Sequence, residues 1–273
     1  MLTRISSIRN ALSTAERRVA DWVLAHPHKV VQLPLAKIAA EIGVSDPTVV
    51  RFCRSAGAKG FTDFKVRIAQ NLASQHFVHA DVRPGDDTGD IVAKVMGRSI
   101  RELASLQQRL DAGRIEEAAR AMASADRIDF YGIGASGSVV QDAQNKFFRL
   151  GVPCVAFHDS PTIRQAAAIS DAGYAVVAVS KTGRSMDVVE ACQQARVNGA
   201  RVIAITSPLS PLARAAEISI LVDIDEDTGA YTPMSSRLAQ LAVLDVIQVA
   251  FAMELGSSGS QKLELAKNAL LVM

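Results

Sequence analysis

The pattern of apolar and polar positions predicts an all-helical first third and a remainder in which strands alternate with helices. In the first third, Ser13 and Glu16 have the spacing of a capping box, in which each side chain satisfies a backbone N–H group at a helix start. Apolar residues then recur three and four positions apart, at Val19, Trp22 and Val23. Pro27 predicts the end of this helix.

Two further short helices, separated by a tight turn, are typical of a helix-turn-helix motif. The first is predicted over residues 35–42, where Gly43 breaks it. The second is capped by Ser45, has Pro47 in its first turn and ends at Gly57. The contacts between these two helices are expected from small or apolar side chains: Ile38, Ala39, Ile42, Val44, Val49 and Phe52.

The remaining face of the second helix is polar and basic, and it carries Ser45, Thr48, Arg51 and Arg54. Arginine can contact O6 and N7 of guanine, while serine and threonine suit phosphates or base edges. Basic residues that follow and could hold the DNA backbone are Lys59, Lys65 and Arg67. These residues predict a DNA-binding surface, and a helical hairpin with a solvated basic face is the alternative.

Beyond residue 90, helical patterns over residues 90–110 and 114–124 precede short β-branched runs that alternate with helices. The predicted strands are residues 127–131, 152–157, 174–179, 201–206 and 218–222. This order predicts an α/β fold with a doubly wound parallel sheet, in which ligands bind where strands end and helices begin. Helices 90–110 and 234–255 are the expected oligomer surfaces, although ordinary core packing explains their apolar faces equally well.

Two polar segments interrupt these patterns. Residues 80–90 are rich in turn formers, so we interpret them as a linker between domains of residues 1–79 and 91–273, with an ordinary surface loop as the alternative. Residues 256–260 predict a flexible hinge before a last helix. The most apolar stretch, residues 238–253, is broken by polar side chains, and no apolar run approaches the roughly 20 residues of a bilayer span.

Two strand-to-helix junctions carry candidate chemistry. Residues 132–137 fit G-x-G-x-x-G, and Asp159 stands about where a dinucleotide fold places its ribose carboxylate, so NAD binding is one interpretation. Residues 180–185 place three hydroxyls and a glycine before a helix that starts near Met186. Hydroxyl donors and a helix N-terminus together suit a phosphate dianion. A site that uses both loops favours one compact phosphorylated molecule, and simple helix capping is the alternative.

The distribution of charge changes the expected partners. The 273 residues have a formal net charge of +2, which by itself argues against nucleic acid. Residues 1–79, however, hold 11 Lys and Arg against 5 Asp and Glu, a balance of +6, and residues 80–273 hold 19 against 23, a balance of −4. A basic first third favours double-stranded DNA as its partner. Three scattered cysteines and the lack of a signal-peptide pattern favour the cytoplasm, with no disulfide framework and no metal site.

Both regions resemble known families. The loop from Gly132 to Ser136 and the run from Thr182 to Ser185 resemble the sugar isomerase (SIS) domain. The segments at residues 48–54 and 59–65 resemble the RpiR-type helix-turn-helix. Within that family, residues 142–149, 226–228 and 234–241 are similar to the regulators of hexose catabolism.

The resemblance implies a repressor of sugar catabolism genes that a phosphorylated sugar releases from an inverted-repeat operator. For the hexose-catabolism members the effector is 2-keto-3-deoxy-6-phosphogluconate, and no cofactor is implied. The expected effector-binding residues are Ser136, Gly137, Ser180, Lys181, Thr182, Gly183 and Ser185. The expected DNA-binding residues are Ser45, Thr48, Arg51, Arg54 and Lys59, presented by a homodimer or tetramer. Many SIS loops have Gln or His at the position of Lys181, whose ammonium group would contact the phosphate or point to solvent.

A metabolic enzyme is the competing class. Some SIS domains isomerise sugars, which needs a base that moves a proton between carbons, and His158 and Glu190 are the candidates. A histidine at a strand end is more often structural, and Glu190 is expected on a solvated helix face. An NAD-dependent enzyme using residues 132–137 is the other alternative. The fused DNA-binding module favours a sensor without catalysis.

Overall fold

The computed structural model describes residues 1–9, 12–74, 79, 81–83, 85–226 and 232–269. The chain forms two compact units, residues 1–95 with 227–232, here the helical unit, and residues 96–226 with 233–273, here the sheet unit. The division falls after Val95, inside helix α7 (Thr88–Arg109). Positions 80 and 84 of that linker, and 227 and 228 of the family-like segment, lie outside the described residues.

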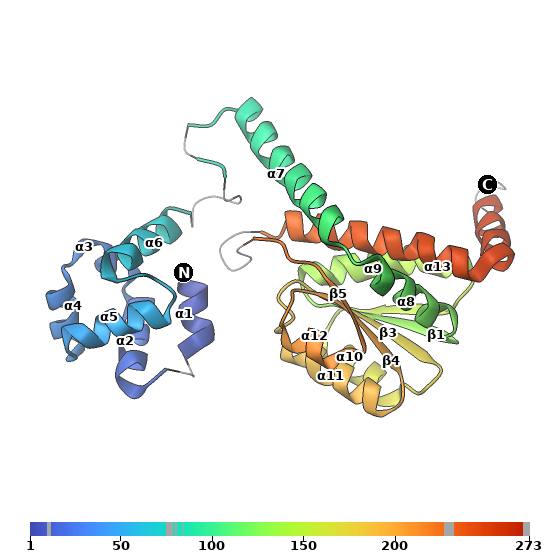
Figure 1. Cartoon of the computed structure of the whole chain (residues 1–273), viewed down its shortest axis with the longest axis horizontal. Coiled ribbons are helices and arrows are strands. Elements are labelled where there is room, and N and C mark those ends of the chain that lie inside the picture. The colour runs from blue at the N-terminus through green and yellow to red at the C-terminus, as the bar shows by residue number, and fades with distance from the viewer. Residues whose placement is uncertain (10–11, 75–78, 80, 84, 227–231, 270–273) are drawn as a thin grey trace. The chain divides into compact units, whose positions relative to one another are not determined.

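The helical unit contains six helices before α7 in its described residues (Figure 1). They are α1 (Leu2–Ile8), α2 (Thr14–Ala25), α3 (Pro27–Gln32), α4 (Leu35–Ile42), α5 (Asp46–Ser55) and α6 (Phe61–Ser74). Pro27 ends α2 as predicted and is also the first residue of α3, a position where the missing N–H costs nothing. The core between the helices includes Val19, Ile38, Ala39, Ile42, Val49, Phe52 and Phe64.

Glycines with positive φ end both helices of the predicted helix-turn-helix. Gly43 has φ 73°, and its N–H and that of Val44 donate to the carbonyl of Ala39 at 2.9 and 3.0 Å. Gly57 has φ 89° and follows α5. Both turns confirm the predicted helix ends, because side chains other than glycine are strained in this left-handed conformation.

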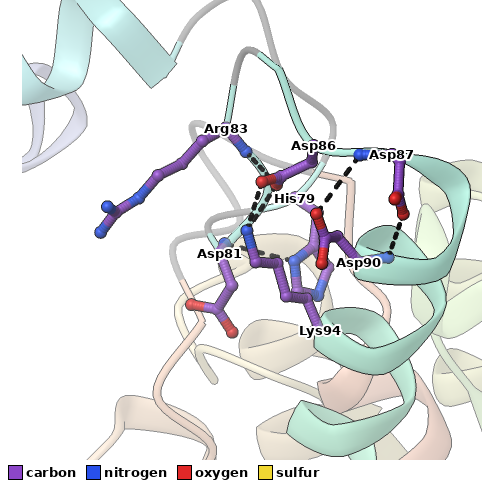
Figure 2. A network of polar contacts seen from close by, with 7 residues as sticks. All are labelled: His79, Asp81, Arg83, Asp86, Asp87, Asp90 and Lys94. Carbon is purple, nitrogen blue, oxygen red and sulfur yellow. Dashed lines mark hydrogen bonds and ion pairs between the residues drawn. The ribbon is translucent and has the colours of Figure 1, made fainter.

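The described part of the predicted linker is a folded turn that starts α7, as Figure 2 shows. The carboxylates of Asp87 and Asp90 each accept the backbone N–H of the other residue, at 2.8 and 3.4 Å. Lys94, in the next turn of the helix, lies 2.6 Å from both carboxylate oxygens of Asp86, which also accepts the N–H of Arg83 at 2.7 Å. The hydrogen bond from Lys94 lowers the pKa of Asp86.

The sheet unit contains the predicted five-stranded parallel sheet, in the order β2-β1-β3-β4-β5. The strands are β1 (Arg127–Tyr131), β2 (Cys154–Phe157), β3 (Tyr174–Ser180), β4 (Arg201–Thr206) and β5 (Ile218–Leu221). Each strand end lies within two residues of its predicted position. Strand β2 pairs with one edge of β1, and the next strand along the chain, β3, pairs with the opposite edge of β1. The direction in which successive strands are added therefore reverses between β1 and β3.

Helices cover both faces of the sheet (Figure 1). One core joins the sheet to α8 (Ala112–Ala123), α9 (Ala135–Phe147) and α13 (Ser235–Asn268), with the short helix η2 (Phe148–Leu150) beside them. The other core joins it to α10 (Ser160–Ile169), α11 (Met186–Val197) and α12 (Pro211–Ala215). Successive residues of β3 alternate between the two cores, with Val177 in the first and Val176 in the second. A central strand buried on both sides explains its uninterrupted apolar run.

Helix α13 differs from its prediction in two ways. By length and composition it is the one helix among the described residues that could cross a membrane, yet Val243, Leu244 and Ile247 are buried in the core of the sheet unit. The predicted hinge over residues 256–260 is wrong in extent. Only Gly256, with φ 59° and ψ −138°, leaves the helical conformation, so two helices meet at a one-residue kink and the predicted last helix follows it.

Candidate functional site

The two predicted phosphate loops lie at the same edge of the sheet. Strands β1 and β3 are parallel neighbours, with Tyr131 paired to Ala178 at their carboxyl ends. The first loop connects β1 to α9, and the second connects β3 to α11, which begins at Met186 as predicted. Two helix N-termini therefore stand side by side where the strand order reverses, which is the place where such sheets bind ligands.

The first loop depends on the absence of side chains at two glycines. A Cβ atom at Gly132 would lie 2.7 Å from the carbonyl oxygen of Ser136, and one at Gly137 would lie 3.2 Å from the Cβ of His158. This close approach brings the first turn of α9 against the end of β1. The hydroxyl of Ser136, 8% exposed, donates to Oε1 of Gln240 in α13 at 3.4 Å.

The second loop carries hydroxyls that accept hydrogen bonds from the loop itself. Oγ of Ser180 accepts the N–H of Gly183 at 3.1 Å, and Oγ1 of Thr182 accepts the N–H of Arg184 at 3.4 Å. Ser185 is the N-cap residue of α11, and its side chain makes no capping hydrogen bond. In each of these bonds the hydroxyl acts as the acceptor, so its own proton is available to donate to a phosphate oxygen.

Gly183 fixes the shape of the second loop. It is buried with φ 58°, and a Cβ atom there would lie 2.3 Å from Oγ of Ser210 and 2.4 Å from Oγ1 of Thr206. Its carbonyl accepts the N–H of Leu212 at 3.1 Å. The loop is therefore held by contacts with the connection between β4 and α12.

Lys181 is held inside the sheet unit and does not point to solvent. Its ammonium group is half-buried and donates to the main-chain carbonyl of Glu226. The carboxylate of Glu226 accepts the N–H groups of Met234, Ser235 and Ser236 at 2.9, 3.0 and 3.1 Å, and the hydroxyl of Ser236. Burial raises the pKa of Glu226, but the hydrogen bonds from Ser236 and the backbone outweigh burial and leave this pKa below 4.5.

The start of α13 is thus a third part of the site that the sequence analysis did not predict. It contacts the first loop through Gln240 and the second loop through Glu226. In the sequence, the signal for this part of the site was Glu226 followed by the serine pair at 235 and 236. Acidic and hydroxyl side chains of this kind are typical of a helix N-terminus.

The residues proposed for the enzyme alternatives have other contacts. The carboxylate of Asp159 accepts the hydroxyl of Thr162 at 2.6 Å and its N–H at 3.0 Å, which lowers the pKa of Asp159 and caps α10. Glu190 is exposed and forms an ion pair with Arg164 at 3.7 Å. His158 is exposed beside the first loop. Within the described residues, no group of three or more His, Cys, Asp or Glu side chains could hold a metal ion.

In the helical unit, α5 and the residues beside it expose four of the five predicted DNA-binding residues. Ser45, Arg51, Arg54 and Lys59 are exposed. Thr48 differs from its expected exposure, because it is only 7% exposed and its hydroxyl contacts Oγ of Ser45 at 2.9 Å and Nη2 of Arg51 at 3.4 Å. The structure therefore gives Thr48 a position from which it orients its two neighbours.

Two of the following basic residues are engaged within the helical unit. Lys65 donates to the carbonyl of Leu33 at 3.2 Å and lies over the ring of Phe61. Arg67 forms an ion pair with Asp63 at 3.0 Å. The exposed basic surface therefore centres on α5 and the residues directly after it.

Comparison with known proteins gives matches over both units. Residues 1–75 match the family described as helix-turn-helix domain, rpiR family, and residues 121–250 match the SIS domain. The HTH-type transcriptional regulator HexR of Escherichia coli K12 is 41% identical over 271 residues, which cover 99% of this chain and 94% of that protein.

Two further matches extend the comparison. A Burkholderia thailandensis protein named bifunctional protein glk is 38% identical over 262 residues, which cover 96% of this chain but only 41% of that longer protein. The structure of Vibrio vulnificus NanR complexed with ManNAc-6P has a TM-score of 0.66 at 24% identity, covering 100% of this chain and 98% of that chain. This structural likeness concerns the fold.

Proposed function

Because the chain belongs to the RpiR family of transcriptional regulators, as a HexR-type member with an SIS domain, we propose that it represses sugar catabolism genes and that a phosphorylated sugar acid releases it from DNA. The proposed effector is 2-keto-3-deoxy-6-phosphogluconate. The observation that carries the proposal is the pair of hydroxyl-bearing loops at the ends of β1 and β3, in a chain that also carries the helix-turn-helix.

The phosphate of the effector binds between the N-termini of α9 and α11. Hydroxyls of Ser180, Thr182 and Ser185 donate to its oxygens, and the positive ends of two helix dipoles favour its charge. The hydroxyl of Ser136 donates to Gln240, so this residue contributes to the site through the position of the first loop. Residues 80–273 have a balance of −4, so the attraction for an anion must be local. Lys181 supplies a positive charge at the edge of this site.

The DNA is bound by two copies of α5, one from each protomer of a homodimer, in successive major grooves of an inverted repeat. Arg51 and Arg54 contact base edges, and Lys59 contacts the phosphate backbone. The dimer surface lies on α7 and α13 of the sheet unit, where exposed apolar side chains include Met96, Ile100, Val249 and Met253. The effector acts by preferring the protomer arrangement that does not fit the operator.

Catalysis is not part of the proposal. The Escherichia coli relative, which matches along nearly its whole length, is named as a regulator. Asp159 is used as a helix cap, which is a poor position for a ribose ligand. Stabilisation of the protein by NAD alone, or turnover of a hexose phosphate, would favour the enzyme alternatives.

The test combines a ligand panel with an operator gel shift. An operator is selected from random duplex DNA, and thermal stability is measured with NAD, hexose phosphates and phosphorylated sugar acids. We expect 2-keto-3-deoxy-6-phosphogluconate to stabilise the protein and to release the operator. Ser180→Ala should weaken that release and leave operator binding intact, and Arg54→Ala should do the opposite. Loss of operator binding in Ser180→Ala, with effector affinity unchanged, would contradict the assignment.

A further inference from the structure

One buried amide in the sheet unit has an unsatisfied hydrogen-bonding atom. The side chain of Gln240 is 2% exposed, and its Nε2 has no hydrogen-bond partner within the described residues. A buried amide N–H that lacks an acceptor costs free energy, and most buried polar groups in proteins have partners. The Nε2 group of Gln240 therefore needs a hydrogen-bond acceptor that the described protein atoms do not supply.

The location of Gln240 connects this amide to the candidate effector site. Its Oε1 accepts the hydroxyl of Ser136, a residue of the first phosphate loop, at 3.4 Å. The turn of α13 that precedes it is held by Glu226, whose main chain in turn holds Lys181 of the second loop. The unsatisfied amide thus belongs to the helix that contacts both loops.

We propose that the amide of Gln240 binds an oxygen on the carbon chain of the effector, next to the phosphate and distinct from it. This inference rests on the proposed function, because it takes a phosphorylated sugar acid as the ligand. The phosphate has its own donors at the N-termini of α9 and α11. An additional neutral donor from a third element suits a hydroxyl, carbonyl or carboxylate oxygen.

The role of such a donor is selectivity. A site built to hydrogen-bond one ligand group discriminates strongly against ligands that lack it, because the buried protein group is then left unpaired. The two loops alone would bind the phosphate of a sugar acid and free phosphate equally. Gln240 would therefore make the site bind phosphorylated sugar acids more tightly than free phosphate.

The test is Gln240→Met, which keeps the length of the side chain and removes the amide. Calorimetric titration of the full chain is carried out with 2-keto-3-deoxy-6-phosphogluconate and, separately, with inorganic phosphate. We expect the affinity for the sugar acid to fall about tenfold or more, and the affinity for phosphate to stay within about twofold. Gln248→Met is the matched control, because its amide lies on the same helix but donates to the carbonyl of Lys146 at 3.2 Å.

Several outcomes overturn the inference. Unchanged affinity for the sugar acid in Gln240→Met shows that the amide does not bind it. An equal loss for both ligands shows that Gln240 acts only by positioning Ser136. A lower unfolding temperature of the ligand-free variant, with the same ligand-induced rise as the wild type, shows a structural role. If the wild type binds phosphate but not the sugar acid, the proposed effector itself fails, which these measurements distinguish from a failure of Gln240 alone.

Discussion

The ammonium group of Lys181 donates a hydrogen bond to the main-chain carbonyl of Glu226, 45 residues further along the chain. The side chain of Glu226 accepts three backbone N–H groups at the start of α13. Glu226 therefore holds the second loop through its main-chain carbonyl and the start of α13 through its carboxylate. In the proposed function, a phosphate bound at the second loop would share this ammonium group with the Glu226 carbonyl, which would link ligand binding to the position of α13.

The first prediction concerns the charge on Lys181. Lys181→Met removes the one ammonium group among the proposed effector-binding residues, and a hydrogen bond to a charged group contributes about 1.5–3 kcal/mol. We expect the affinity for 2-keto-3-deoxy-6-phosphogluconate to fall about tenfold or more in calorimetric titration. Lys262→Met, an exposed position on α13, makes the same charge change and should bind as the wild type does. If Lys181→Met binds the effector with wild-type affinity, the lysine does not contact the phosphate and its role is limited to the hydrogen bond with Glu226.

The second prediction concerns the pH dependence of stability. Because the folded-state pKa of Glu226 lies below its ordinary 4.5, its contribution is complete at neutral pH and is lost as the pH falls through the folded value. Glu226→Gln should lower the free energy of unfolding by about 2 kcal/mol at neutral pH. The difference from the wild type should shrink as the pH falls below 4.5 toward the lower folded-state pKa.

Urea unfolding at several pH values measures this difference. Glu217→Gln is the control, since its carboxylate is in a surface ion pair with Arg201 at 3.2 Å and should change stability by less than about 1 kcal/mol. A difference for Glu226→Gln that stays constant down to low pH would contradict the assigned direction of the pKa shift.

The third prediction separates backbone strain from steric conflict in the two loops. Gly134 and Gly183 both have positive φ, at 64° and 58°, but a Cβ atom at Gly134 meets nothing within 4 Å. Gly134, with ψ −126°, lies outside the left-handed helical region, and Gly134→Ala should destabilise the protein by about 1–3 kcal/mol through conformation alone. Gly183→Ala should cost more, because its Cβ also overlaps Ser210 and Thr206. Denaturant unfolding compares the two, and equal losses would exclude the steric contribution.

The fourth prediction distinguishes base contacts from phosphate contacts on the DNA-binding surface. Arg54→Ala should weaken binding to the selected operator by about 1–3 kcal/mol and relax its sequence preference. Lys59→Ala should weaken binding to all duplexes alike and reduce the slope of log affinity against log salt by about 1. Lys29→Ala on α3, where the lysine pairs with Glu41 at 3.4 Å, is the control and should leave both quantities unchanged. An identical response of Arg54→Ala and Lys59→Ala would contradict the two roles.

Much of the fold could be predicted from the sequence, because the patterns that indicate its strands and helices are local. The bounds of β1 and β4 match their predictions, since buried parallel strands are continuous apolar runs bounded by polar residues. The two loops were found for the same reason, as short motifs directly after strands. The burial of Thr48 was not predictable from periodicity, because it depends on how α5 packs against α2, α4 and α6 together.

The part of the site that comes from α13 depends on contacts between distant positions. Ser136 and Gln240 are 104 residues apart, and nothing in either local pattern indicates that they meet. Gln240 is one of the polar side chains that break the apolar stretch of residues 238–253, and its burial beside the first loop explains why a polar side chain is present there. Such contacts follow from the packing of α13 on α9, which only the tertiary structure provides.

The proposed use of hydroxyls and main-chain N–H groups as phosphate donors has a consequence for how binding depends on ionic strength. Binding through neutral donors releases few counterions, whereas a basic DNA surface releases one for each phosphate that it neutralises. Under the proposed function, rising salt should therefore weaken operator binding more steeply than effector binding. A given concentration of the effector should then free a larger fraction of the operator at higher ionic strength.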